Sequence, residues 1–223
     1  MNVVEVLETL RGQLGEGGLL KNEAMAARAL AIQTAGGADP GDILVGVRPA
    51  ATLTSIERLD ALARAHLGGP LPAEVRALYG ACDGIHAGVR GAISVEGDHY
   101  ERGLQPIARI IEELSSPIIT VTLPSGEKVE RHLAVFPLVD VPDQGWLALD
   151  PWRPGWPMIV LWFDEVDLGE GIGIPDQPEC VSAGCTVVAP SLAAGLSRWI
   201  ASGFDVFWPN HDQAELLADA AER

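Results

Sequence analysis

Apolar residues recur at helical spacing in two segments at the beginning of the chain, and glycines separate the two. Residues 3–14 carry a single apolar stripe, which predicts a helix with one buried face. Residues 21–34 are rich in alanine, the residue with the highest intrinsic helix propensity. The pattern therefore predicts two N-terminal helices on either side of Gly15 to Gly18, followed by a turn-rich, soft boundary over residues 36–54.

The clearest helical signal lies at residues 71–84. Pro72 suits a first helical turn, and Glu74 lies where the positive end of the helix dipole favours a carboxylate. Gly84 follows as a residue able to take positive φ at the helix end. The positions that share the apolar face are Val75, Leu78, Tyr79 and Cys82. These features predict a short amphipathic helix whose role is packing rather than catalysis.

Further helices are predicted from caps and apolar spacing. Thr54 to Glu57 matches a capping box and predicts a helix that continues to Leu67. Residues 107–114 form another candidate helix, and Ser191 can cap a helix through Ile200. A last polar helix is expected over residues 212–220.

Strand signals dominate after residue 90. The best hairpin joins residues 118–123 to residues 128–135 across Pro124-Ser125-Gly126, a strong turn sequence. The other segments of strand length are residues 43–47, 92–95, 136–141, 145–149 and 158–163. The chain thus reads as helices first and then mostly strands.

The charge balance is strongly acidic, with a formal net charge of −16. Such a field repels nucleic-acid phosphates and anionic lipid surfaces, so we expect no nucleic-acid and no membrane partner. A basic protein is the natural electrostatic match, and the alternative is that acidity only keeps the chain soluble. No segment approaches the length of a membrane span, and the acidic N-terminus does not resemble a secretory signal, which predicts a cytoplasmic protein. Its three cysteines are not expected to form structural disulfides.

Motifs for catalysis or cofactor binding are not recognisable in the sequence. There is no Gly-x-Ser-x-Gly elbow, and the glycine-rich stretches lack the Gly-Lys-Ser/Thr ending of a phosphate-binding loop. Cys180 and Cys185 lack the paired short spacings of a zinc site, and the histidines are scattered. We therefore predict no catalytic residues, no metal and no cofactor.

The candidate binding residues gather in the C-terminal half of the chain. Four carboxylates follow an apolar run, and they are Asp164, Glu165, Asp167 and Glu170. Their spacing does not fit an EF-hand, so the alternatives are a solvated strand end and an acidic docking surface for a cationic protein. Trp152 and Trp156, in a proline-rich stretch, are candidates for an exposed rigid loop, with packing in the core or loop as the alternative. Asp143, in the turn before Trp146, completes the predicted partner-binding set.

The order of these elements resembles the SUKH superfamily, which includes fungal regulators of cell-wall synthesis and many bacterial immunity proteins of polymorphic toxin systems. The first signature is a helix, a Leu-Pro step, an amphipathic helix and an Asn-Gly-like exit. Here it is matched by residues 56–67, Leu71-Pro72, residues 75–79 and Asp83-Gly84, with Asp83 in place of the usual Asn.

The second half of the resemblance lies in the strands. Residues 136–150 are similar to the central strand pair of the family, and residues 158–165 are similar to the next strand with its acidic end. Residues 191–200 correspond to the closing helix. The resemblance covers residues 54–203, and the expected domains are a helical N-terminal extension (1–53), a SUKH-like α+β domain (54–203) and a C-terminal tail or helix (204–223).

The resemblance implies a mostly antiparallel sheet flanked by helices, which binds another protein without chemistry of its own. The leading hypothesis is a cytoplasmic immunity protein that neutralises a toxin domain, with a basic nuclease as one candidate target. The alternatives are a regulatory scaffold or small-ligand-binding module of the same fold, and a hydrolase whose site one sequence does not reveal.

Overall fold

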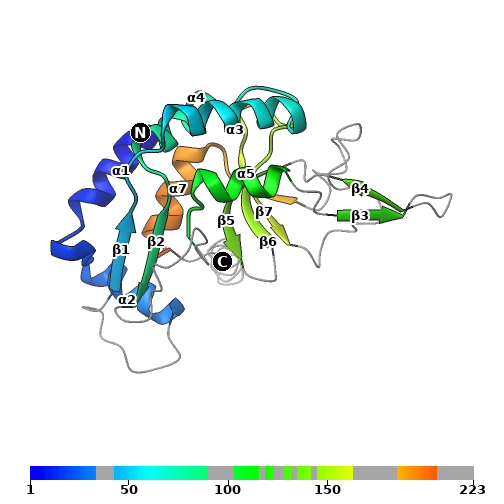
Figure 1. Ribbon diagram of the computed structural model, residues 1–223. Coiled ribbons are helices and arrows are strands. Elements are labelled where there is room, and N and C mark those ends of the chain that lie inside the picture. Colours follow the sequence, from blue (N-terminus) through cyan, green and yellow to red (C-terminus); the bar gives the residue numbers. More distant parts are fainter. Residues whose placement is uncertain are drawn as a thin grey trace.

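The computed structural model describes residues 1–33, 43–89, 103–115, 119–122, 128–131, 135–141, 145–162 and 185–204. Within these ranges the chain is a mixed α+β protein, as predicted (Figure 1). The helical elements are α1 (Val3–Gly12), the 3₁₀ turn η1 (Glu16–Gly18), α2 (Glu23–Gln33), α3 (Leu53–His66), α4 (Ala73–Ala81), α5 (Ile107–Ser115) and α7 (Leu192–Ala201). The strands are β1 (Ile43–Val47), β2 (Ile85–Val89), β3 (Ile119–Thr122), β4 (Lys128–Arg131), β5 (Phe136–Val141), β6 (Gly145–Leu149), β7 (Met158–Trp162) and β8 (Cys185–Ala189).

All strand pairs in these ranges are antiparallel. Strands β5 to β8 follow one another in an up-and-down sheet, and β1 pairs with β2. Leu104 bridges Ile85 of β2 and Val139 of β5, so it connects the two sets of strands. The predicted hairpin is confirmed, because β3 pairs with β4 from Ile119 opposite Arg131 to Thr122 opposite Lys128.

The helices pack against these strands around one hydrophobic core. Helix α1 contacts α4 and α7, and α3 contacts both α4 and α5. The largest fully buried side chains come from distant parts of the chain and include Leu7, Tyr79, Phe136 and Trp199. Helices flank the antiparallel strands, which confirms the predicted α+β class.

The first 53 residues contribute directly to this core. The buried face of α1 consists of Val3, Val6, Leu7 and Leu10. The Arg11 side chain donates a hydrogen bond to the Ala81 carbonyl at 2.7 Å, and Arg28 donates to the Ala201 carbonyl at 3.0 Å. The helices before residue 54 therefore share hydrogen bonds and buried surface with α4 and α7.

Some details differ from the sequence prediction. Helix α3 is capped by Thr52, whose hydroxyl accepts from the Ser55 amide at 3.1 Å, so the helix begins before the predicted Thr54 cap. A backbone bond from the Ala51 amide to the Tyr79 carbonyl fixes the chain just ahead of that cap. Strands β2 and β8 were not predicted. The predicted strand 92–95 and helix 212–220 lie outside the described residues.

Asp60 joins α3 to the beginning of α4. Its carboxylate accepts from the Leu71 amide at 2.8 Å and from the side chains of Arg64 at 3.0 Å and Arg76 at 2.5 Å. Burial alone would raise the pKa of Asp60, but these three hydrogen bonds outweigh it and hold the pKa below its ordinary value. The ionised Asp60 carboxylate therefore stabilises the folded chain relative to the unfolded chain.

We expect Asp60→Asn to lower the free energy of unfolding at pH 7 by about 1–2 kcal/mol, because it weakens charge-assisted hydrogen bonds. The pKa of this carboxyl is lower in the folded than in the unfolded chain, so its stabilisation is present above the unfolded value of about 3.9. It is lost as pH falls through the lower, folded value. Urea unfolding of the unmodified chain and of Asp60→Asn, at pH 7 and stepwise below pH 4, should show that their difference in free energy of unfolding shrinks at low pH. A difference that stays constant with pH would contradict this prediction.

Candidate functional site

The predicted partner-binding residues fall into two groups. Asp143, Asp164, Glu165, Asp167 and Glu170 lie outside the described residues. Trp152 and Trp156 lie in the loop of residues 150–157, which connects β6 to β7. We call this segment the tryptophan loop.

The tryptophan loop is held by a buried carboxylate at its beginning. Asp150 is fully buried, and its Oδ1 accepts from the Trp152 amide at 2.9 Å. The Arg153 Nε lies 3.0 Å from Asp150 Oδ2. The loop closes through backbone bonds from Asp150 N–H to the Pro157 carbonyl at 3.0 Å and from Trp156 N–H to the Arg153 carbonyl at 3.1 Å. This network fixes the loop conformation before any partner binds.

Both tryptophans of this loop are half-buried rather than exposed. The Trp152 ring lies so close to Gly68 that a Cβ at that glycine would be 3.2 Å from two of its carbons. Trp156 packs against the core, with its ring centroid 6.3 Å from that of Phe136. Each ring therefore combines intramolecular packing with an accessible part.

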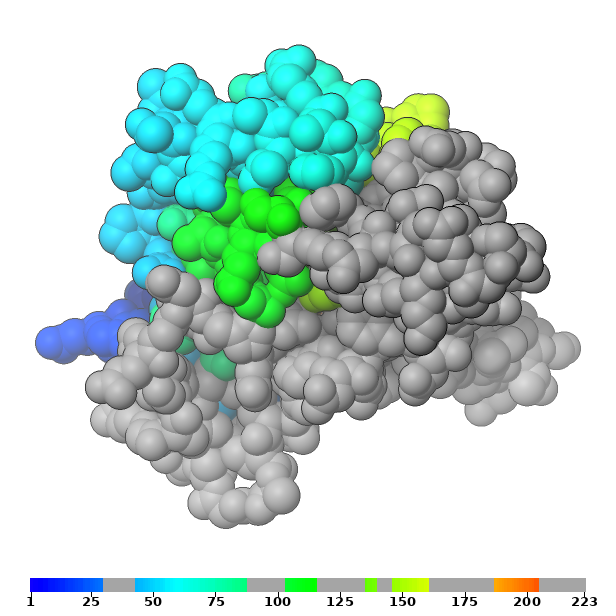
Figure 2. All heavy atoms as spheres, turned by 45° about the vertical axis from the view of Figure 1, so that its right-hand side comes forward, coloured from blue at the N-terminus to red at the C-terminus, as the bar shows by residue number. Residues whose placement is uncertain are grey.

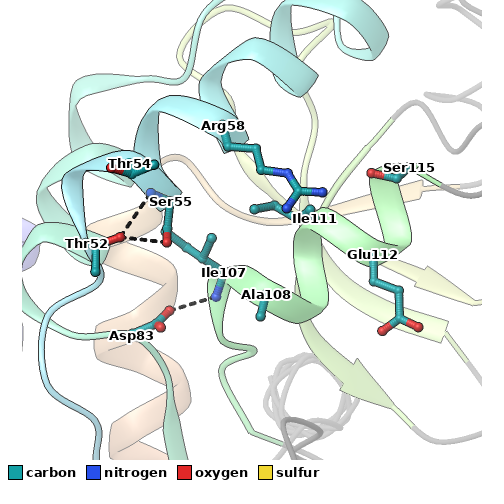
Figure 3. Close-up of a pocket in the computed structure, with 10 residues that line it drawn as sticks. All are labelled: Thr52, Thr54, Ser55, Arg58, Asp83, Ile107, Ala108, Ile111, Glu112 and Ser115. Atoms are coloured by element: carbon teal, nitrogen blue, oxygen red, sulfur yellow. Dashed lines mark hydrogen bonds between the residues drawn. The ribbon is translucent and has the colours of Figure 1, made fainter.

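A second candidate site is a cavity of about 530 Å³ between α3 and α5. Figure 2 shows α5 (green) lying against α3 (cyan) on one face of the molecule. Ile107 and Ile111 form the buried apolar part of the lining, with 1% and 8% of their surfaces exposed. The Thr54, Arg58 and Ser115 side chains surround the same space (Figure 3). A cavity of this size is in the range that small organic ligands fill.

The charged side chains of this cavity differ in what they contact. Asp83 Oδ1 accepts from the Ile107 amide at 2.7 Å. Glu112 Oε2 lies 2.9 Å from a guanidinium nitrogen of Arg109. Arg58 is exposed and, within the part of the chain that the structure describes, makes no hydrogen bond or ion pair (Figure 3). Its guanidinium is therefore available to a ligand.

The titratable side chains with shifted pKa values elsewhere are Tyr79, Cys82 and the half-buried His86. The Tyr79 hydroxyl donates to the Gln105 carbonyl at 3.0 Å, and burial raises its pKa well above the ordinary value. Cys82 is a buried free thiol, as predicted, and burial raises its pKa to about 11, so it is protonated at neutral pH. Burial, with a contribution from the charge on Arg48, lowers the pKa of His86. A protonated thiol is a poor nucleophile.

Among the described residues, no group of three or more His, Cys, Asp or Glu side chains is placed to hold a metal ion. None of the helices there has the length and apolar character needed to cross a bilayer.

The cavity between α3 and α5 was not predicted from the sequence. Its lining combines the beginning of α3, the turn after α4 and one face of α5, which are far apart along the chain. The signal in the sequence is the group of three hydroxyl residues around the start of α3, Thr52, Thr54 and Ser55, of which Thr52 and Ser55 also form the helix cap. Comparisons of the chain with protein-family models, with curated proteins and with solved structures found no match.

Proposed function

We propose that this chain is a non-catalytic protein-binding module, and specifically a cytoplasmic immunity protein that neutralises a toxin domain. The observation that carries the proposal is the tryptophan loop, in which Asp150 fixes the backbone and two large, partly accessible aromatic side chains pack on their neighbours. Aromatic residues in preorganised loops provide large contact areas at little cost in conformational entropy. Because the chain has a net charge of −16, the partner is expected to be basic, with a nuclease as one candidate.

The proposal is tested by co-expressing the chain with the toxin-like domain encoded beside its gene. Immunity requires both the rescue of growth and the recovery of a stable complex. We expect Trp152→Ala to weaken that complex, whereas Trp199→Phe, a conservative change at a fully buried core position, should leave its dissociation constant unchanged. Toxicity that persists in the presence of the folded chain, with no complex recovered, would contradict the proposal.

We further expect the carboxylates after β7 to accelerate association with a basic partner. Replacing Asp164, Glu165, Asp167 and Glu170 by their amides should slow association by about tenfold at low salt, because electrostatic steering raises on-rates. Stopped-flow measurements between low and high ionic strength will show whether that difference disappears as salt screens the charges.

The matched control removes the same number of charges from another part of the chain. Glu8, Glu16, Glu23 and Glu57 lie in or beside the N-terminal helical elements and α3, and their replacement by Gln should change the association rate far less. Equal slowing by both sets would mean that only net charge matters, and unchanged association in the first set would remove the acidic segment from the mechanism.

A second candidate function, a small-ligand-binding module of the same fold, is favoured by one observation. This is the cavity between α3 and α5, whose Arg58 makes no ion pair with any residue in the described ranges. The dissociation constant of a ligand in this cavity should change little with ionic strength, whereas the rate of an electrostatically steered protein association should fall as salt rises.

A further inference from the structure

We infer that the cavity between α3 and α5 binds a small organic monocarboxylate with an apolar body, and that Arg58 pairs with the carboxylate. The inference is independent of toxin binding, because no residue of the tryptophan loop lines this cavity.

The charge distribution in the cavity favours an anion. Arg58 carries the guanidinium that makes no ion pair within the described ranges, whereas Asp83 and Glu112 already contact the Ile107 amide and Arg109. An arginine presents a planar fork of donors that matches a carboxylate with two parallel hydrogen bonds. In a chain with a net charge of −16, carboxylates outnumber basic side chains, so an arginine over a cavity that pairs with none of the described carboxylates is informative.

The rest of the lining sets the chemistry of the ligand. Ile107 and Ile111 present apolar surface, and the exposed Ala108 leaves space beside them. An apolar body can cover these side chains while the carboxylate remains at Arg58 (Figure 3). The Ser115 hydroxyl, which makes no hydrogen bond within the described part of the chain, is an additional donor for the carboxylate oxygens, whereas the Thr54 hydroxyl points away from Arg58 (Figure 3).

A phosphate monoester fits this cavity less well than a carboxylate. Its charge is about −1.5 to −2 at neutral pH, compared with −1 for a carboxylate. Asp83 and Glu112 line the same cavity, so the additional negative charge would be repelled. The lining therefore favours a single negative charge.

The test titrates the full chain with octanoate in an isothermal titration calorimeter. We expect one saturable site with a Kd below about 1 mM. The uncharged analogue 1-octanol has the same chain length but lacks the carboxylate, so it should bind at least about tenfold more weakly. The absence of saturable octanoate binding, or tighter binding of octyl phosphate than of octanoate, would overturn the inference.

Two variants at Arg58 separate the effect of its positive charge on octanoate binding from the effect of its forked guanidinium. Arg58→Gln should weaken octanoate binding at least about tenfold, and Arg58→Lys, which keeps the charge without the fork, should cause a smaller loss. Arg64→Gln is the matched control, because it removes the same charge from α3 at a residue that does not line the cavity. A Kd for Arg58→Gln equal to that of the unmodified chain would overturn the role of Arg58.

A third variant tests the cavity without changing Arg58. Ala108 is an exposed residue in the first turn of α5, where a carboxylate is compatible with helix formation, so Ala108→Glu should fold. The new carboxylate would add a negative charge to the cavity lining beside Glu112 and repel the ligand carboxylate, so octanoate binding should be lost. Octanoate binding that persists in folded Ala108→Glu would place the ligand elsewhere and overturn the inference.

Discussion

Replacing Gly203 by alanine will lower the free energy of unfolding by about 3 kcal/mol. Gly203 has a φ of 85°, in the region that L-residues avoid. A Cβ built at this position would lie 2.6 Å from the backbone nitrogen of Ala29 in α2. A backbone atom cannot move aside as a flexible side chain can, so the strain of the positive φ and the clash add together.

The surrounding geometry explains why Gly203 is needed. The Gly203 amide donates to the Ile200 carbonyl and the Phe204 amide to the Trp199 carbonyl, each at 3.0 Å, which forms a Schellman motif at the end of α7. The Trp199 and Phe204 rings accompany it, with their centroids 5.2 Å apart. This motif brings the end of α7 against α2, so a change at Gly203 affects the N-terminal helices as well.

Urea unfolding of two further glycine variants separates the two causes. Gly155 has a φ of 83° but open space around it, so Gly155→Ala should cost only about 1 kcal/mol, the strain of the positive φ. Gly80 lies within α4, again with open space, and Gly80→Ala should stabilise the chain by about 0.5–1 kcal/mol. If Gly203→Ala cost no more than Gly155→Ala, the close packing of α2 on α7 would be contradicted.

Replacing Asp150 by alanine will lower the free energy of unfolding by about 3 kcal/mol and release the tryptophan loop. The fully buried Asp150 carboxylate accepts a hydrogen bond from the Trp152 amide and forms an ion pair with Arg153. Asp150→Ala removes both interactions. The hydrogen bond from the Trp152 amide to this charged group contributes about 1.5–3 kcal/mol, and the ion pair with the partly exposed Arg153 adds a smaller share. We expect near-UV circular dichroism of the tryptophans to change together with stability.

Asp150→Asn provides the matched comparison, because it keeps the acceptor for the Trp152 amide but removes the charge that faces Arg153. The loss of free energy of unfolding in Asp150→Asn should be smaller than the loss in Asp150→Ala. Glu8→Ala, at an exposed position in α1, should change stability by less than about 0.5 kcal/mol. A cost below about 1 kcal/mol for Asp150→Ala would mean that burial of this carboxylate opposes its hydrogen bonds almost fully.

Local sequence signals were sufficient for most of the individual elements. The helix α4 lies where the apolar spacing between Pro72 and Gly84 placed it, and Ser191 caps α7 by accepting from the Ala194 amide at 3.2 Å. The β3–β4 hairpin follows from its turn sequence and flanking strands. Strand β2 was missed because its residues, Ile85–Val89, include Ala87 and Gly88, which have low strand propensity. Its pairing with β1 stabilises it instead.

The candidate sites depended on contacts between segments that are distant in the sequence. Trp152 could be placed in a loop, but its packing on Gly68 and the burial of Asp150 require the folded sheet. The cavity beneath Arg58 exists only because α3 and α5 lie side by side. The sequence by itself determined the local elements and the acidic charge, since helix caps, turns and periodicity act between near neighbours. Only the tertiary structure decided that Arg58 faces a cavity and that Asp150 is buried, because side-chain pairing and solvent exposure depend on how distant segments pack.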